Sequence, residues 1–246
     1  MKRLSDAKRD RNTVYGIVRG SSMQHNGRGA SFVAPTITSQ EALIRAALKD
    51  ANLVPEDFDI IEAHGTATAL GDPVEVSALT KVFGKRKRDP LLVGSVKANT
   101  GHVEAAAGMI GLVKFVMTLG YKHMPPNAQL RCLNENVETA VGDGCLSFPQ
   151  TLTDLGSRKT ADHPKLIGDI SGFGACGTIV HIVMEESDDA NIGSKLNKLK
   201  NNPVDYNPQT FPLDLMSYNP DTGALTSTKA SAADETTVIA SYLDII

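Results

Sequence analysis

Tryptophan is absent from this chain, and aromatic residues make up only 5% of its 246 residues. So few aromatic side chains argue against a stacking platform for single-stranded nucleic acid. The formal net charge of −3 likewise gives no overall electrostatic case for binding DNA or RNA. We therefore expect no nucleic acid among the partners of this protein.

Cysteines and long apolar runs are also scarce. The chain has three cysteines, an odd number that does not form a disulfide framework. This favours a reducing compartment such as the cytoplasm, with an organelle left open. No run reaches the ~20 apolar residues of a membrane span. The basic segment 1–9 is not followed by an apolar core, so we expect no secretory signal.

Hydrophobic residues form 41% of the chain, which is enough for a globular core. Strand-like runs are predicted at 13–21, 59–63, 91–96, 166–170 and 178–184. Helices are predicted at 38–51, at 72–84 and from the turn at Gly101 to about Leu119. The order βαβαβαββ predicts an α/β layered fold in which helices cover a sheet.

Several local features refine this pattern. Thr38 and Glu41 have the spacing of a capping box. Small residues such as Ala105 and Gly108 suit close packing, so the third helix is expected to be buried in the middle of the fold. The composition divides the chain into a folded domain at 1–186 and an acidic, Asn/Pro/Ser-rich linker or poorly ordered tail at 187–246.

Two histidines each follow a predicted strand. His64 comes directly after the strand at 59–63, and His102 lies in the turn after the strand at 91–96. Because the carboxyl ends of parallel strands meet at one edge of a sheet, we expect the two imidazoles to converge there. A neutral imidazole near a helix N-terminus can polarise a carbonyl oxygen. The pair predicts an oxyanion site, with Lys97 adding positive charge at its rim.

Plainer interpretations stay open for these residues. His102 could be an exposed residue at a helix cap, and Lys97 a surface lysine beside the turn. A metal site is disfavoured, because the sequence offers neither a third ligand nor the spacing typical of zinc.

The segment Gly172–Gly177 matches the three-glycine pattern of a dinucleotide-binding loop. That pattern requires a helix next, whereas Thr178–Met184 is typical of a strand. We therefore reject an NAD-binding oxidoreductase and predict a glycine hairpin that passes close to a site.

Several short motifs are spread over residues 2–186: Asn26-Gly27-Arg28, Ala34-Pro35, Ser39–Ile44, Glu62–Thr66, Leu70–Glu75, Lys97–His102, Glu104–Gly108 and Phe173-Gly174. Together they resemble the C-terminal half of a β-ketoacyl synthase, the ketosynthase domain of polyketide and fatty acid synthases. The resemblance is greatest to the ketosynthases of type I, multidomain polyketide synthases. It implies the C-terminal half of a thiolase-like layered fold.

In that family an active-site cysteine holds an acyl chain, and two histidines bind the thioester oxygen of a malonyl-type extender. They support its decarboxylation, and the resulting carbanion attacks the acyl-cysteine in a Claisen condensation. His64 and His102 match the two family histidines. Lys97 matches the lysine beside the second histidine, and Glu104 matches an acidic residue often found after it.

The resemblance also implies how substrate is delivered. No bound cofactor is expected, because the substrate arrives on the phosphopantetheine of an acyl carrier protein. The residues implied as substrate contacts are Thr66, Thr68, Asn99 and Gly174. The basic run Lys85–Arg88 is interpreted as a solvated loop, with docking of the carrier as the second interpretation.

One departure concerns the nucleophile. The family's cysteine lies in an N-terminal half that this sequence does not include, and Cys132, Cys145 and Cys176 do not match it. We therefore expect the isolated chain to be inactive in condensation. The missing half is an expected partner, and the complete domain is expected to be capable of forming a homodimer.

A second departure lies in the glycine loops. Ala67 replaces a usual glycine, Ala175 stands at the position of a gating phenylalanine, Cys176 at that of a glycine, and Ile179 at that of an asparagine. These changes keep open an alternative function as a non-catalytic binding or scaffold module. In either case, a half-domain alone is expected to expose the apolar face of its inner helix.

Overall fold

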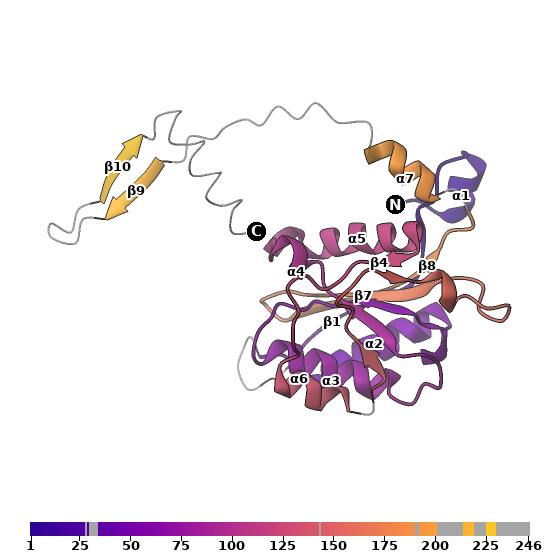
Figure 1. Ribbon diagram of the computed structural model, residues 1–246, viewed down its shortest axis with the longest axis horizontal. Helices are drawn as coiled ribbons and strands as arrows, with labels where there is room; N and C mark the ends of the chain where they lie inside the picture. Colours follow the sequence, from indigo (N-terminus) through magenta and orange to yellow (C-terminus); the bar gives the residue numbers. More distant parts are fainter. Residues whose placement is uncertain are drawn as a thin grey trace. The chain divides into compact units, whose positions relative to one another are not determined.

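The computed structural model describes residues 1–27, 29, 34–142, 144–189, 192–200, 214–218 and 225–229. The chain divides into two units, Met1–Asn201 and Asn202–Ile246. The first unit contains a six-stranded sheet with helices on both faces (Figure 1). In the second unit, β9 (Asp214–Tyr218) pairs antiparallel with β10 (Leu225–Lys229).

The sheet has the strand order β1–β8–β7–β2–β3–β5. Its strands are β1 (Gly16–His25), β2 (Ile60–Glu62), β3 (Leu91–Gly94), β5 (Leu146–Ser147), β7 (Ile167–Phe173) and β8 (Thr178–Glu186). β8 runs antiparallel to β1 and β7, whereas β7, β2, β3 and β5 pair in parallel. The parallel strands are short and apolar because both of their faces are covered. Their carboxyl ends meet at one edge, as the sequence predicts.

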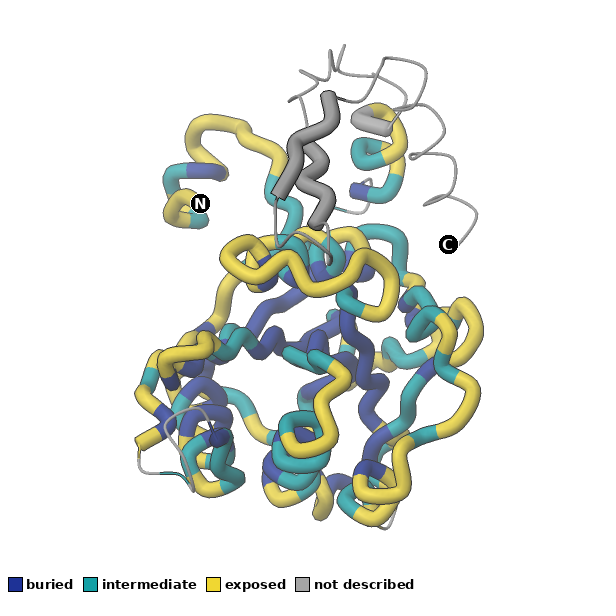
Figure 2. The backbone as a smooth tube through the Cα atoms, turned by 90° about the vertical axis from the view of Figure 1, so that its left-hand side faces the viewer, coloured by how far each residue is buried: buried dark blue, intermediate teal, exposed yellow. Residues whose placement is uncertain are grey.

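Helices form a layer on each face of the sheet (Figure 1). One face is covered by α2 (Ile37–Ala51), α3 (Gly71–Phe83) and α6 (Glu135–Val141), and the other by α5 (Ala107–Tyr121). Each layer has its own apolar core: Phe58, Leu79 and Phe83 belong to the first, and Phe115 and Leu119 to the second. The buried backbone of the sheet lies between them (Figure 2). This is the predicted α/β layered fold.

Short elements complete the first unit. They are α1 (Leu4–Arg9), α4 (Lys97–Thr100), three 3₁₀ turns (Pro55–Asp57, Glu104–Ala106 and Gly156–Arg158), the pair β4 (His123–Met124) and β6 (Thr153–Asp154), and α7 (Ile192–Lys200).

The end of the first strand and the start of helix α2 differ from prediction. β1 extends to His25 rather than ending near residue 21, because β8 continues to pair with it as far as the His25–Thr178 register. α2 is capped by Thr36, whose hydroxyl accepts the Ser39 N–H at 3.3 Å. The predicted capping box of Thr38 and Glu41 is therefore wrong by two residues.

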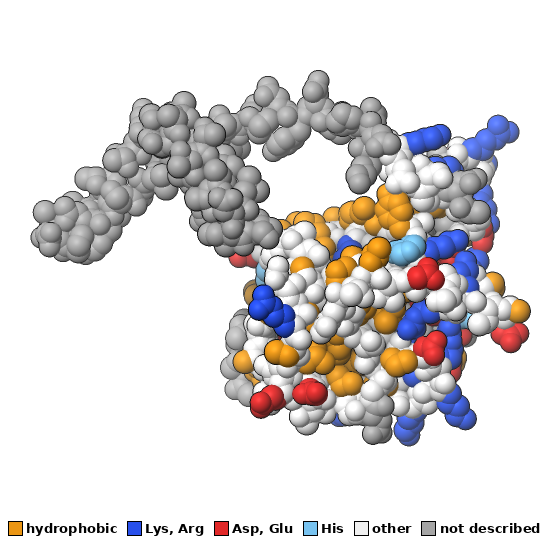
Figure 3. Space-filling view, in the orientation of Figure 1, with side chains coloured by type: hydrophobic (Ala, Val, Ile, Leu, Met, Phe, Trp, Pro, Cys, Tyr) orange, Lys and Arg blue, Asp and Glu red, His pale blue; other side chains and the backbone are white. Residues whose placement is uncertain are grey.

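The prediction of a fully buried third helix is wrong. α5 packs one face on the sheet, but Met109, Val113 and Met117 are 60%, 51% and 42% exposed. They recur every four residues and form one stripe, which we call the α5 stripe. Hydrophobic side chains gather over α5 in the space-filling view (Figure 3). The exposure itself agrees with the expectation for a half-domain standing alone.

Helices also occur where loops or a linker are predicted. α6 forms within 134–150, because the Asn134 side chain accepts the Asn136 N–H at 2.9 Å and caps it. α7 lies beyond residue 186 and packs on α5, with Ile192 only 4% exposed. The first compact unit therefore extends past the predicted domain boundary. Residues 190–191, 201–213, 219–224 and 230–246 of the predicted tail lie outside the described residues.

The basic run 85–88 is a solvated loop only in part: Lys85 and Lys87 are exposed, as predicted, whereas the two arginines are engaged by the fold. Arg86 is 9% exposed, and its guanidinium donates to the Phe58 carbonyl at 2.7 Å. Arg88 pairs with the buried carboxylate of Asp59 at 3.1 Å. Both arginines lie at the amino ends of the parallel strands, at the edge of the sheet opposite the two histidines. Their position argues against the second interpretation, the docking of a carrier.

By length and composition alone, the segment Glu104–Tyr121 is apolar enough to cross a membrane. The core helix of a globular protein meets the same criteria, and this segment contains α5. The sequence-based expectation of no membrane span is therefore neither supported nor contradicted by this segment.

Close packing of β7 on β2 depends on Gly168. A Cβ atom there would stand 2.1 Å from the Ile60 carbonyl oxygen and 2.9 Å from the Phe115 ring. We expect Gly168→Ala to lower the free energy of unfolding by about 3 kcal/mol, because the strands must separate. Urea titration measures this loss. Gly172→Ala on the same strand is the matched control, since nothing lies within 4 Å of its Cβ position. An equal loss in the control would contradict this explanation.

Candidate active site

The loop after β2 is held by a buried carboxylate from α3. Glu75 accepts the backbone N–H groups of His64 at 2.8 Å and of Gly65 at 2.9 Å. Gly65 has a φ of +43°, and a Cβ there would lie 2.8 Å from Ser95 Cβ. The turn therefore requires glycine for both its conformation and its packing.

The loop after β3 is tied to the first loop and to the sheet. The Ser95 hydroxyl donates to the Gly65 carbonyl at 3.2 Å, and the Ser95 N–H donates to Asn127 Oδ1 at 3.0 Å. Buried Glu62 accepts the Val96 N–H at 2.6 Å and pairs with Lys114 at 2.5 Å. The chain then passes through α4 and reaches His102 after Gly101, whose φ is +76°.

These loops bring the two predicted histidines together. The His64 and His102 ring centroids are 5.8 Å apart, with an interplanar angle of 88°. His64 Nδ1 accepts the Phe173 N–H at 3.3 Å, and His102 Nδ1 accepts the Glu104 N–H at 3.2 Å. Because both Nδ1 atoms accept hydrogen bonds, each neutral ring carries its proton on Nε2. Both rings are therefore hydrogen-bond donors.

Burial shifts the pKa values of three groups in the site towards their neutral forms. It lowers the pKa of His64 to about 4, with further lowering by Lys97 and His102, so this ring is neutral at pH 7. Burial also lowers the pKa of Lys97, partly offset by Glu75 and Glu62. It raises the pKa of Glu75 to about 7, against the effect of the two N–H donors. For all three groups, loss of hydration is the largest cause.

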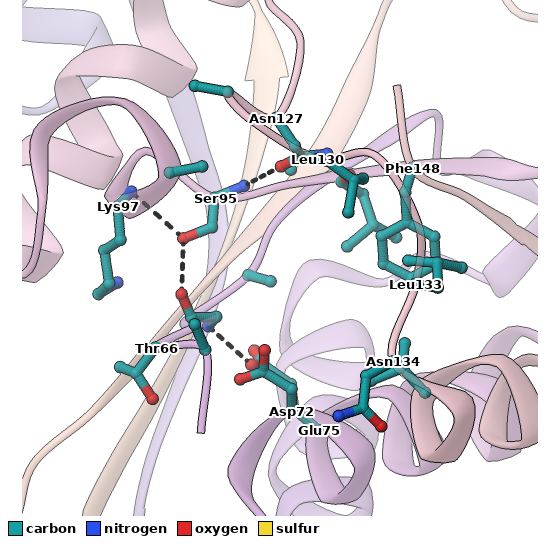
Figure 4. Close-up of a pocket in the computed structure, with 18 of the residues that line it drawn as sticks. Thr66, Asp72, Glu75, Ser95, Lys97, Asn127, Leu130, Leu133, Asn134 and Phe148 are labelled. Atoms are coloured by element: carbon teal, nitrogen blue, oxygen red, sulfur yellow. Dashed lines mark hydrogen bonds between the residues drawn. The ribbon is translucent and has the colours of Figure 1, made fainter. Parts of the chain in front are cut away.

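Two cavities meet at His102. The first has a volume of about 520 Å³ and is lined by Lys97 but not by His64. In Figure 4, Lys97 and Thr66 lie on the side opposite the apolar group Leu130, Leu133 and Phe148. The second, about 480 Å³, is lined by His64 but not by Lys97. The residues that line both are Thr66, Asp72, Glu75 and His102.

Residues 15–131 match the family model described as beta-ketoacyl synthase, C-terminal domain. This chain contains the C-terminal domain of a β-ketoacyl synthase. The central sheet and its helix layers match those of ketosynthases of type I polyketide synthases, as the sequence predicts.

Curated relatives of this ketosynthase domain are much longer proteins. The PKS-NRPS hybrid synthetase acdB of Aspergillus candidus is 41% identical over 76% of this chain, which covers 7% of that protein. The PKS-NRPS hybrid synthetase ATPKS of Aspergillus niger is 40% identical over 76% of this chain, which covers 10% of it.

Solved ketosynthase structures agree with this fold. The oxazolomycin ketosynthase domain OzmH KS7 of Streptomyces albus aligns with a TM-score of 0.71 and 34% identity. The alignment covers 76% of this chain and 32% of that one. The module 6 ketosynthase of the Bacillus subtilis bacillaene synthase gives a TM-score of 0.70 with 34% identity, covering 76% and 33%. This chain thus spans about a third of each solved domain.

The other predicted site residues of the ketosynthase domain differ in whether they line a cavity. Thr66 lines both cavities, while Thr68 and Gly174 line only the second. Asn99 is exposed on α4 and lines neither cavity. Glu104, also exposed, contacts His102 through its backbone N–H rather than through its carboxylate.

Sequence reasoning missed the residues that orient the two loops. Glu75 ends one of the family-like motifs, and an acidic residue between Val74 and Val76 on an apolar helix face is a signal of a buried acceptor. Phe173 gave no such signal. Its backbone N–H reaches His64 only because β7 lies beside β2 in this register.

The raised pKa of Glu75 predicts a pH dependence of stability. Between pH 4.5 and about 7 the folded carboxyl keeps a proton that the unfolded chain has released. The contribution of Glu75 to the free energy of unfolding is therefore largest below pH 4.5. It decreases as the pH rises, until the folded carboxyl ionises near pH 7. A ¹³C-labelled Glu75 carboxyl should titrate with a midpoint near pH 7 in NMR spectra.

The control for this prediction is Glu75→Gln, which removes the titrating group. The difference in unfolding free energy between the two proteins should change with pH across this range and be flat above it. A carboxyl midpoint near the ordinary value of 4.5 would contradict the burial argument.

Proposed function

We propose that this chain supplies the two oxyanion-donating histidines of a polyketide ketosynthase that performs decarboxylative Claisen condensation. The extender is a malonyl-type thioester on the phosphopantetheine of an acyl carrier protein. The pathway is polyketide or fatty acid biosynthesis. The supporting observation is the pair of adjacent imidazoles, each with Nδ1 accepting a backbone N–H, beside the two cavities.

The chemistry needs donors that do not protonate the reacting carbon. Loss of CO₂ from the malonyl group breaks a carbon–carbon bond and leaves the electron pair as an enolate. Two Nε2–H donors stabilise the enolate oxygen, each by roughly 3–4 kcal/mol where well placed. The α-carbon then attacks the acyl thioester on cysteine, a new carbon–carbon bond forms, and the cysteine thiolate leaves. His64, neutral above about pH 4, suits the donor role.

The nucleophilic cysteine comes from outside the described residues in this proposal. Cys132 and Cys176 are exposed, Cys145 is partly buried, and none of the three lines either cavity. The remaining part of a ketosynthase domain, about two-thirds of the solved structures, is the proposed partner that carries the thiol. The homodimer of the complete domain is likewise a proposal.

The α5 stripe is the proposed docking face for that partner. Apolar side chains at this spacing on a helix are normally covered, and a row of exposed ones is the kind of surface that binds a partner. The stripe begins at Met109, a few residues after His102 in the chain. A partner seated there would also lie beside the histidine pair.

Substitution of the second histidine tests the oxyanion role. In the chain assembled with a ketosynthase N-terminal half, we expect His102→Ala to slow malonyl-carrier decarboxylation by about 10²–10³-fold. Release of CO₂ from labelled malonyl carrier measures the rate.

His123→Ala is the matched control, because His123 is exposed on β4 and lines neither histidine cavity. It should retain the wild-type rate. Unchanged decarboxylation in His102→Ala would refute the assigned role.

A charge within the α5 stripe tests the docking face. Val113→Asp should leave the chain folded, since this side chain is 51% exposed, but should abolish its assembly with the N-terminal half. Analytical ultracentrifugation of the mixture measures assembly. Val54→Asp places the same charge at a valine that is 54% exposed and precedes the 3₁₀ turn Pro55–Asp57, which packs on α3. Equal assembly of both variants would rule out this face.

A non-catalytic binding or scaffold module is the second candidate function. Ala175 and Ile179 line the second cavity at positions where the family has a gating phenylalanine and an asparagine. A scaffold would assemble with the N-terminal half yet release no CO₂ from malonyl carrier. The same assay therefore separates the two functions.

A further inference from the structure

A buried polar cluster lies inside the sheet, and none of its residues lines either cavity. His181 and Asp169 are 0% exposed, and Ser171 is 5% exposed. His181 Nδ1 lies 3.1 Å from the Ser171 hydroxyl, and His181 Nε2 lies 3.1 Å from Asp169 Oδ2. One imidazole thus bridges two residues of the neighbouring strand. The proposed mechanism uses none of these three groups.

The carboxylate of Asp169 lies close to His181 without a well-formed hydrogen bond. The His181–Asp169 approach is short, yet neither carboxylate oxygen makes a hydrogen bond of good geometry to any described residue. A buried carboxylate is costly unless a partner compensates it. The close imidazole is therefore its main compensation, and losing the imidazole would leave the carboxylate without it.

The cluster lies directly behind the floor of the second cavity. On one face of the β7–β8 ladder, the pairs are Phe173–Ile179, then Ser171–His181, then Asp169–Val183. Phe173 and Ile179 line the cavity, so the imidazole of His181 is one pair further into the sheet. The Ser171–His181 contact thus joins β7 and β8 at the first same-face pair beyond the residues that line the cavity.

The position of Phe173 matters for His64. The Phe173 N–H donates to His64 Nδ1 at 3.3 Å, which is long for a hydrogen bond, and the two rings are 5.0 Å apart. A small displacement of the end of β7 would break this bond. Without it, nothing described on the site fixes which nitrogen of His64 holds the proton.

We propose that His181, held by Asp169 and Ser171, is a positioning residue that fixes the tautomer of His64 through the end of β7. Its importance for catalysis rests on the proposed function of His64 as an Nε2–H donor. The tautomer itself is independent of that function. Hydrogen-bonding groups behind a reacting imidazole commonly set its tautomer and orientation in this way.

The test uses ¹⁵N imidazole NMR of the full 246-residue chain, with the His64 signal assigned from His64→Gln. We expect the wild type to hold Nε2–H on His64. Ser171→Ala should shift the ratio of the two tautomers about fivefold towards Nδ1–H, the effect of losing one neutral hydrogen bond. Ser171→Thr keeps the hydroxyl and should restore the wild-type ratio.

Two controls separate positioning from general loosening. Val183→Ala removes apolar contacts on the same face, opposite Asp169, and should lower the unfolding midpoint without changing the His64 tautomer. His102 should keep its tautomer in every variant, because its Nδ1 is bound by the nearby Glu104 N–H.

An equal tautomer shift in Val183→Ala and Ser171→Ala, at matched loss of stability, would overturn the proposal. So would an unchanged His64 in Ser171→Ala. No carrier or malonyl substrate is present, so failure of the condensation assay leaves this result intact. Conversely, a confirmed tautomer effect in a chain that supports no decarboxylation would refute only the proposed function.

Discussion

A single buried carboxylate holds the candidate site together. Glu75 accepts the N–H groups of His64 and Gly65, and the Ser95 hydroxyl joins Gly65 to the loop that leads to His102. Gly65 has no room for a Cβ against Ser95, so the two loops pack closely at this point. Helix α3 and the loops after β2 and β3 therefore behave as one connected support for both imidazoles.

The electrostatics of the site have one common cause. Burial lowers the pKa of His64 and Lys97 and raises that of Glu75, so each group is driven towards its neutral form. At pH 7 the neutral His64 therefore offers a hydrogen bond and no fixed charge. Such a setting is suited to a negative charge that exists only during the reaction, because pre-oriented donors need not reorganise when it forms.

The order of strands and helices and the convergence of His64 and His102 could be predicted from the sequence, because both follow from local periodicity and strand direction. The glycine hairpin before Thr178 was also predictable from its turn chemistry. The bond from Phe173 to His64 was not, since it depends on the register of β7 beside β2. Nor was α7, whose place is set by close packing between Gly120 and Leu196.

Helix α5 joins two properties in one element. Its first turns follow the loop of His102, and its outer face is the α5 stripe, the most exposed apolar group along the helix. Under the proposed function, the N-terminal half would cover the α5 stripe and would also bring the nucleophilic thiol. An unassembled chain would then lack both the thiol and a cover for this apolar face, so that one association step would supply solubility and activity together.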